Sequence, residues 1–328
     1  AAAEFHAWFD AEGRLGAQGL DCLRRAAYYG GVCPQLRKLA WPFLLGCYPP
    51  NSTTQERVAL RAAKAAEYQG YRRQWLSVTP EQAQRFGKFR ERKQRIDKDV
   101  VRTDRTQSVF ASEQGEGLRT LHDVLLSYAF FNFDLSYCQG MSDLASPLVA
   151  VMHDEVEAFW CFQRLMETTG GNFHKDQKGM QAQLQAMQRI CKVLEPALLQ
   201  YLEEREAANF YFCFRWLLVL FKRELPFAEV QRLWEALWAK VRGSDLHLFL
   251  AMAILRRHAP TIINRRLGFD QLLEYINDLS LKLNLPELLV EADTLYQRYN
   301  SILSAASSPT VGPSASPGGS STSSPPTR

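Results

Sequence analysis

The sequence predicts an all-α protein that consists of one large multi-helix domain followed by a disordered tail. Apolar residues recur at helical spacing in several segments, whereas no Asn-Gly or Asp-Gly hairpin turn occurs anywhere and no strand–helix alternation can be traced. Ten of the 15 prolines lie in residues 1–303, and none lies between positions 81 and 146. At an ordinary helix length of about 11–12 residues, the chain accommodates roughly a dozen or more helices. No internal repeat of fixed period occurs, which argues against a regular α-solenoid.

Five segments justify the helical prediction. Residues 118–128, 184–194 and 285–299 each place apolar side chains on one face, three or four residues apart. Residues 156–166 are apolar nearly all round, which is typical of a buried helix. Residues 210–221 are dense in aromatic side chains and could form a strand by composition, but the pattern that follows them is helical, so we predict a buried helix. The tryptophans expected in the core are Trp41, Trp160, Trp216 and Trp234.

Composition sets the expected domain boundaries. Residues 304–328 contain nine Ser, three Thr, five Pro and three Gly, so this tail has almost nothing to bury and is predicted to be disordered. The domain itself is expected to span residues 20–303, after an N-terminal extension over residues 1–19, part of which can stem from cloning. The short N-terminus suggests a fragment of a larger protein.

Several classes of protein and site are excluded by what the chain lacks. Its seven cysteines are scattered without a CxxC pair and its six histidines are isolated, which argues against a zinc site and a secreted disulfide scaffold and favours a reducing, cytoplasmic compartment. No apolar stretch approaches the roughly 20 residues of a membrane span, and the N-terminus has no signal-peptide pattern. The GxxxxGK[ST], HExxH and GxSxG motifs are also absent, so no nucleotide site of the P-loop type is expected.

The net charge of +4 is unevenly distributed along the chain. Residues 85–105 hold nine Lys/Arg and four Asp/Glu, so this segment carries more positive charge than the whole protein. Such a segment points weakly to an anionic partner such as phosphate, nucleic acid or a membrane surface, and on charge alone a solvated helix face is the preferred interpretation.

Two short motifs stand out from this background. The first has the form IxxDxxR and is carried by Ile96, Asp99 and Arg102. The second has the form YxQG and is carried by Tyr137, Gln139 and Gly140. Arg102 is followed by a polar stretch, and Gln139 precedes an apolar run, so both side chains are expected on loops or helix ends from which they can reach outward.

These motifs resemble the two signatures of the TBC-domain GTPase-activating proteins for Rab GTPases (RabGAPs). Two further segments agree with this family in chain order. The first consists of Gly31, Val32, Leu36, Arg37 and Trp41. The second consists of Phe214-Arg215-Trp216, residues 221–227 and Leu233-Trp234. The resemblance extends from about residue 20 to about residue 300 and implies an all-α fold in two helical halves.

The resemblance also implies a function, namely acceleration of GTP hydrolysis on a GTP-bound Rab-family GTPase. Arg102 would be an arginine finger, since its planar guanidinium matches phosphate oxygens and can stabilise charge between the β- and γ-phosphates. Gln139 would be a glutamine finger that positions the attacking water, a task normally performed by a glutamine of the GTPase. GTP and Mg²⁺ would belong to the partner, so the chain needs no cofactor or metal of its own.

Supporting roles are expected for neighbours of the two fingers. Asp99 lies three residues before Arg102 and can hold its guanidinium, and the Tyr137 hydroxyl can anchor the Gln139 loop. Arg105 could contact the partner's acidic surface or simply be solvated. Arg37 is expected in an internal ion pair. The remaining positions assigned to support or Rab binding are Ile96, Thr103, Gly140 and Asp143.

Two alternatives stay open at this stage. A TBC-like fold can serve as a non-catalytic Rab-binding scaffold, although the presence of both fingers argues against this role. The basic segment could instead bind nucleic acid or phospholipid, which ranks well below the other readings. The segments around residues 102–106 and 210–227 look most like the branch of the family that acts on late-endosomal or vacuolar Rabs. Peripheral association with endomembranes would then occur through the partner or through flanking regions.

Overall fold

The structure is a computed structural model that describes residues 2–307 of the chain. Within this range the chain forms 16 α-helices and three short 3-10 helices, without a β-strand. The all-α prediction is therefore confirmed. None of the described helices combines the length and the apolarity that crossing a bilayer requires.

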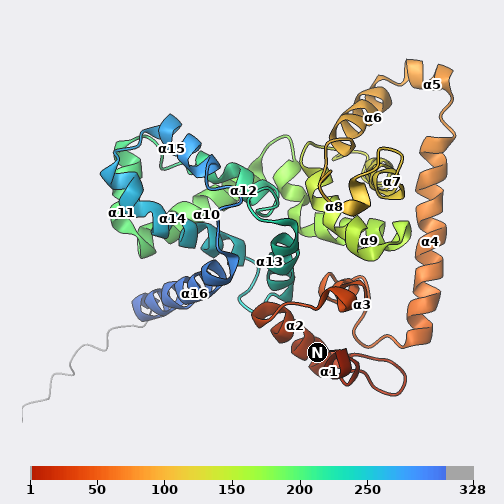
Figure 1. Ribbon diagram of the computed structural model, residues 1–328, viewed down its shortest axis with the longest axis horizontal. Coiled ribbons are helices and arrows are strands. Elements are labelled where there is room, and N and C mark those ends of the chain that lie inside the picture. The colour runs from red at the N-terminus through yellow and green to blue at the C-terminus, as the bar shows by residue number, and fades with distance from the viewer. Residues whose placement is uncertain (1, 308–328) are drawn as a thin grey trace, which may run out of the picture.

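The helices form two groups (Figure 1). The first group centres on α7, which packs against α4, α6, α8 and α9. Its elements are α1 (Ala2–His6), α2 (Gly16–Tyr29), α3 (Pro34–Leu44), α4 (Thr54–Leu76), α5 (Pro80–Arg85), α6 (Gly87–Val100), the 3-10 helix η1 (Ser108–Phe110), α7 (Glu116–Phe131), α8 (Met141–Met152) and α9 (Glu155–Thr169).

In the second group α14 packs against α16 and α10. Its elements are η2 (Gly170–Phe173), α10 (Lys178–Leu194), α11 (Pro196–Glu204), η3 (Tyr211–Cys213), α12 (Phe214–Leu218), α13 (Phe227–Ala239), α14 (Leu246–Asn264), α15 (Phe269–Asn277) and α16 (Leu285–Ser307). Figure 1 shows α13 between the two groups, with α2 and α3 below it.

The two halves are joined where α2 and α3 pack against α13. Arg37 on α3 donates to the fully buried carboxylate of Glu235 on α13 over 2.7 Å, and it also donates to the amide oxygen of Gln231. Trp41 donates its indole N–H to the same carboxylate over 3.0 Å. Arg37 therefore forms the internal ion pair that was expected of it, and the pair links the N-terminal and C-terminal halves.

Local sequence signals explain where several helices begin. Thr53 and Glu56 form a capping box at the start of α4, in which each side chain accepts a hydrogen bond from the other's backbone amide. Asp154 caps α9 by accepting from the amide of Glu157. Pro34 occupies the first turn of α3, where its missing N–H leaves no hydrogen bond unmade.

The predicted helical faces are buried as expected. The periodic apolar residues of α7, α10 and α16 lie in one core cluster, and residues 156–166 lie within the buried helix α9. The four tryptophans expected in the core are buried: Trp41, Trp160, Trp216 and Trp234.

The prediction of a continuous helix over residues 210–221 is only partly right. The segment contains η3 and the five-residue helix α12, and it ends in a turn where Leu220 and Phe221 have positive φ angles of 48° and 59°. A tertiary hydrogen bond holds this turn, because the indole of Trp234 donates to the Leu220 carbonyl over 3.0 Å. The segment is apolar on all sides, so its sequence has no polar face that would mark where the helix must stop.

Helical structure is present on both sides of residues 20–303. Residues 2–19 pack onto the domain, since Phe5 and Leu15 are buried and the ring of Phe9 lies 5.8 Å from that of Phe43 on α3. Helix α16 continues to Ser307, which is four residues into the segment predicted as a disordered tail. The rest of that predicted tail lies outside the described residues.

A histidine ties α6 to α7 and makes stability depend on pH. His122 contacts Asp97 over 3.1 Å and Asp123 over 2.9 Å. Burial lowers the pKa of His122, but the hydrogen bonds to Asp123 and Asp97 outweigh burial and raise it to about 9. Because the pKa is raised on folding, the stabilisation is complete below about pH 6.5 and is lost as the pH rises through about 9.

We therefore expect the stability difference between the parent and His122→Gln to shrink by roughly 2–3 kcal/mol between pH 6.5 and 9. Urea unfolding of both proteins across this pH range measures the difference. A difference that stays constant with pH would show that His122 does not carry the charge that links the two helices.

Candidate functional site

Arg102 lies in a tight turn directly after α6. The buried side chains of Ile96 and Val100 hold the end of this helix against the core. The chain then turns, because the amide of Arg102 donates to the Asp99 carbonyl and the Thr103 hydroxyl donates to the same carbonyl over 2.7 Å. The turn directs the Arg102 side chain outward, where 61% of it is exposed.

Gln139 lies in the loop between α7 and α8. The loop turns sharply at Gly140, whose φ of +101° is one that side-chain-bearing residues rarely adopt. A Cβ at this position would lie 3.1 Å from Val219, so the close packing also favours glycine. The Gln139 side chain is exposed, and it makes no hydrogen bond among the described residues. Its amide is free to bind an external group.

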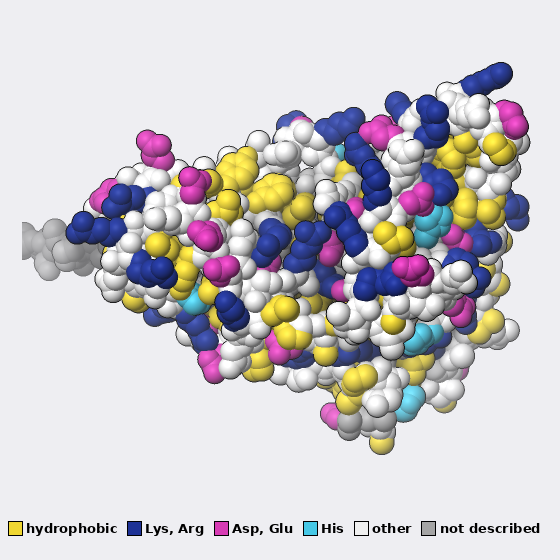
Figure 2. All heavy atoms as spheres, turned by 45° about the horizontal axis from the view of Figure 1, so that its top comes forward, with side chains coloured by type: hydrophobic (Ala, Val, Ile, Leu, Met, Phe, Trp, Pro, Cys, Tyr) yellow, Lys and Arg dark blue, Asp and Glu magenta, His cyan; other side chains and the backbone are white. Residues whose placement is uncertain are grey.

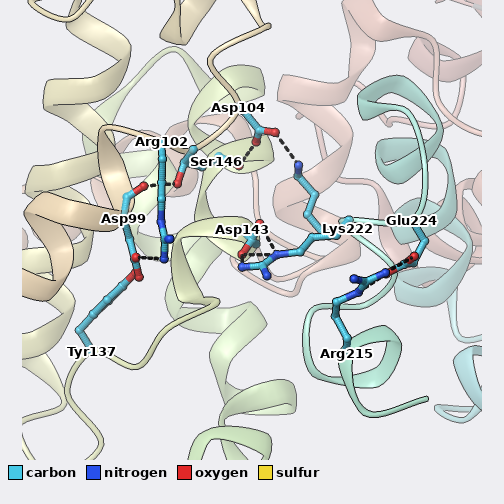
Figure 3. Close-up of polar contacts among 11 residues, drawn as sticks. Asp99, Arg102, Asp104, Tyr137, Asp143, Ser146, Arg215, Lys222 and Glu224 are labelled. Atoms are coloured by element: carbon cyan, nitrogen blue, oxygen red, sulfur yellow. Dashed lines mark hydrogen bonds and ion pairs between the residues drawn. The ribbon is translucent and has the colours of Figure 1, made fainter. Parts of the chain in front are cut away.

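One buried carboxylate connects the two motifs. Asp99 accepts from Arg102 Nη2 through Oδ1 and from the Tyr137 hydroxyl through Oδ2, each over 2.5 Å (Figure 3). Burial and the hydrogen bond to Asp99 raise the pKa of Tyr137, so its hydroxyl stays protonated and able to donate. The loop that carries Gln139 is thereby fixed to the helix end that carries Arg102.

A second set of ion pairs lines the same region as Asp99 and Arg102. It involves Lys222 and Arg223, which follow α12. Arg223 donates to Asp143 at the start of α8 over 2.8 Å. Lys222 donates to Asp104 over 2.7 Å, and Asp104 also accepts from the Ser146 hydroxyl on α8 (Figure 3). Lys222 and Arg223 were not among the residues predicted from the sequence to have a role at the site. The sequence signal that could have identified them is the run of three charged residues at positions 222–224 inside an otherwise apolar stretch. In the structure Lys222 is buried, with 6% of it exposed.

These side chains line an open groove with a volume of about 650 Å³. Its polar lining includes Arg102, Gln139, Asp143, Lys222 and Arg223, and its apolar lining consists of Leu225, Pro226, Phe227 and Leu281. In Figure 2 the visible face is hollowed near its middle, where Lys and Arg side chains lie beside Asp and Glu side chains. The groove presents a guanidinium and a free amide to whatever enters it.

The other residues that were predicted to support the fingers or to bind the Rab are not all exposed at the groove. Ile96 is fully buried and Tyr137 nearly so, so neither can contact a partner, whereas Thr103 lines the groove. Arg105 donates to the backbone carbonyls of Val101 and Ala111 over 3.1 and 2.8 Å, which ties its guanidinium to its own loop. No cluster of three or more His, Cys, Asp or Glu that could hold a metal ion lies within the described part of the chain.

Comparison with known proteins identifies, by sequence, the family that the two motifs resemble. By structure, it finds a solved protein with the same fold as this chain. The sequence profile of the family described as Rab-GTPase-TBC domain matches residues 34–263. The crystal structure of the Ypt/Rab-GAP domain of GYP1p superposes with a TM-score of 0.75 at 19% identity, over 90% of this chain and 98% of that one.

Curated relatives are similar over most of this chain. TBC1 domain family member 17 of Mus musculus is 41% identical over 295 residues, which cover 90% of this chain and 45% of the relative. GTPase-activating protein GYP7 of Yarrowia lipolytica is 38% identical over 320 residues, which cover 90% of this chain and 43% of the relative. The chain therefore spans less than half the length of these relatives.

Proposed function

Since this chain belongs to the Rab-GTPase-TBC domain family, we propose that it is a GTPase-activating protein for a Rab-type small GTPase in its GTP-bound state. The observation that carries the proposal is the joining of Arg102 and Gln139 through Asp99 and Tyr137 at one open groove. The Yarrowia relative is itself named a GTPase-activating protein.

In the proposed mechanism Arg102 supplies charge and Gln139 positions water. GTP and Mg²⁺ enter with the partner as its own bound substrate and metal. The guanidinium of Arg102 donates to oxygens between the β- and γ-phosphates, where negative charge develops during hydrolysis. The Gln139 amide accepts a hydrogen bond from the attacking water through its oxygen and donates one to a γ-phosphate oxygen through its nitrogen.

Asp99 and Tyr137 act as positioning residues in this mechanism. The Asp99 carboxylate holds the arginine close to the geometry it needs, so less side-chain freedom is lost when the partner binds. Phosphate oxygens then compete with Asp99 for the guanidinium. Because Tyr137 retains the other carboxylate oxygen, Asp99 keeps a partner when Arg102 moves toward the nucleotide.

Several side chains of the basic segment are bound within the protein, which weakens the case for nucleic-acid binding. On α6 Lys93 pairs with Asp97 over 2.8 Å and Arg95 pairs with Glu91 over 2.6 Å. Arg92 donates to the Phe133 carbonyl over 2.9 Å. Lys93 and Arg95 are therefore ion-paired within their own helix, as on an ordinary solvated helix face.

We also propose that residues 20–303 form the activating domain, that the protein acts in the cytoplasm, and that it reaches endomembranes through its partner or flanking regions. The first substrates to test are late-endosomal and vacuolar Rabs, because two segments of the chain look like the branch of the family that acts on them.

A panel of GTP-loaded Rabs tests the function and separates it from a scaffold role. Phosphate release is measured with and without the chain, and binding to each Rab is measured in parallel. Activation requires accelerated release on at least one Rab. Binding without acceleration would support the scaffold alternative, and neither binding nor acceleration across a full panel would contradict both.

A further inference from the structure

Leu281, in the turn between α15 and α16, has an unfavourable backbone conformation. Its φ of +61° lies in the left-handed region, which costs free energy for a side chain other than glycine, asparagine or aspartate. The side chain is also 65% exposed, so burial within the protein does not compensate for the strain. Neither local conformation nor the core therefore explains a leucine at this position.

The turn is held in place by the segment that forms one wall of the groove. The Leu281 amide donates to the Glu224 carbonyl over 2.8 Å, and the Ser280 hydroxyl donates to the Arg223 carbonyl over 2.6 Å. Glu224 is itself fully buried and accepts two hydrogen bonds from Arg215, over 2.7 and 2.9 Å. Leu281 is thus fixed at the edge of the groove that Arg102 and Gln139 line.

Leu281 shares the groove lining with other apolar residues, and a further exposed apolar residue directly precedes Arg102 in the chain. Pro226 and Phe227 line the same groove as Leu281, and Val101, the residue before Arg102, is 60% exposed outside the groove lining. A protein that brings its nucleotide to Arg102 enters the groove that the exposed Leu281 side chain also lines. Apolar contacts at the margin of a polar site add affinity, whereas the polar groups perform the chemistry.

We propose that Leu281 is a specificity-determining contact for the partner GTPase, on which it binds an apolar side chain beside the nucleotide site. This inference rests on the proposed function and adds to it which residue selects the partner. Because Leu281 acts in docking, its loss weakens binding and leaves the hydrolysis step at saturation unchanged.

The test replaces Leu281 with asparagine, which tolerates the left-handed conformation and removes the apolar surface. On the most responsive Rab of the panel we expect KM to rise about 5- to 30-fold, as partial loss of one leucine contact implies, with kcat unchanged. The melting temperature should stay the same or rise, because the strain is relieved. Val290→Gln is the matched control, since Val290 is 69% exposed on α16 and does not line the groove; its KM should not change.

Each result separates the inference from the function on which it rests. If the parent accelerates hydrolysis and Leu281→Asn has the parental KM, the inference is wrong and the proposed function stands. A fall in kcat at constant KM would also overturn it, because Leu281 would then act on the groove's geometry. If the parent binds a Rab without accelerating it, a binding titration gives the same comparison through Kd. If the parent neither binds nor accelerates any Rab, the function and the inference both fail.

Discussion

Replacing Arg102 with alanine is expected to lower the stimulated rate of GTP hydrolysis by about 10³–10⁵-fold, the effect of losing an arginine supplied to a GTPase. The guanidinium is exposed, and among the described residues it forms an ion pair with Asp99 alone, so the fold should stay intact. Arg102→Lys should also be severely impaired, because a compact ammonium cannot donate two parallel hydrogen bonds as the planar guanidinium does. Single-turnover phosphate release at a saturating concentration of the chain measures both effects.

Arg90→Ala is the matched control for this prediction. Arg90 is an exposed arginine on α6 and does not line the groove, so its loss should leave the rate at saturation close to that of the parent. Circular dichroism and melting temperatures should show that both variants are folded. An Arg102→Ala variant that stimulates phosphate release as well as the parent would contradict the assigned role of Arg102.

Replacing Gln139 with alanine should lower the stimulated rate on the order of 10²–10³-fold, comparable to the loss of one oriented hydrogen-bonding group in an active site. Its side chain is exposed and makes no hydrogen bond within the described chain, so the loss should not destabilise the fold. The effect should occur even when the partner retains its own glutamine, because in the proposed mechanism water is positioned by Gln139.

Gln107→Ala is a suitable control, since Gln107 is another glutamine that lines the same groove. It should retain most of the parental rate. If Gln139→Ala were equally active, water positioning would have to remain with the GTPase, and the role assigned to Gln139 would be wrong.

Local sequence patterns predicted the features of the fold and site that depend on neighbouring residues. Periodic apolar faces predicted α7, α10 and α16, because each face repeats within one helix. The spacing of Asp99 and Arg102 likewise predicted that their side chains could meet. The contact between Asp99 and Tyr137 joins residues 38 positions apart, and only the folded structure shows that one carboxylate serves both motifs.

Features that depend on distant residues were beyond the reach of sequence patterns. Lys222 and Arg223 bind Asp104 and Asp143, which are 118 and 80 positions away in the chain. Buried or partly buried charges of this kind are stable only where the fold supplies an opposite charge, and no local pattern indicates which one. The turn at residues 219–221 was missed for the same reason, since it depends on a hydrogen bond from α13.

The central claim is that this chain supplies both the arginine and the glutamine for hydrolysis. The most direct measurement is single-turnover phosphate release from a responsive Rab whose own switch-region glutamine has been replaced by alanine. We expect the parent chain still to accelerate this Rab strongly, whereas Gln139→Ala and Arg102→Ala should not. Loss of acceleration by the parent on this Rab, with full acceleration on the unmodified Rab, would contradict the claim.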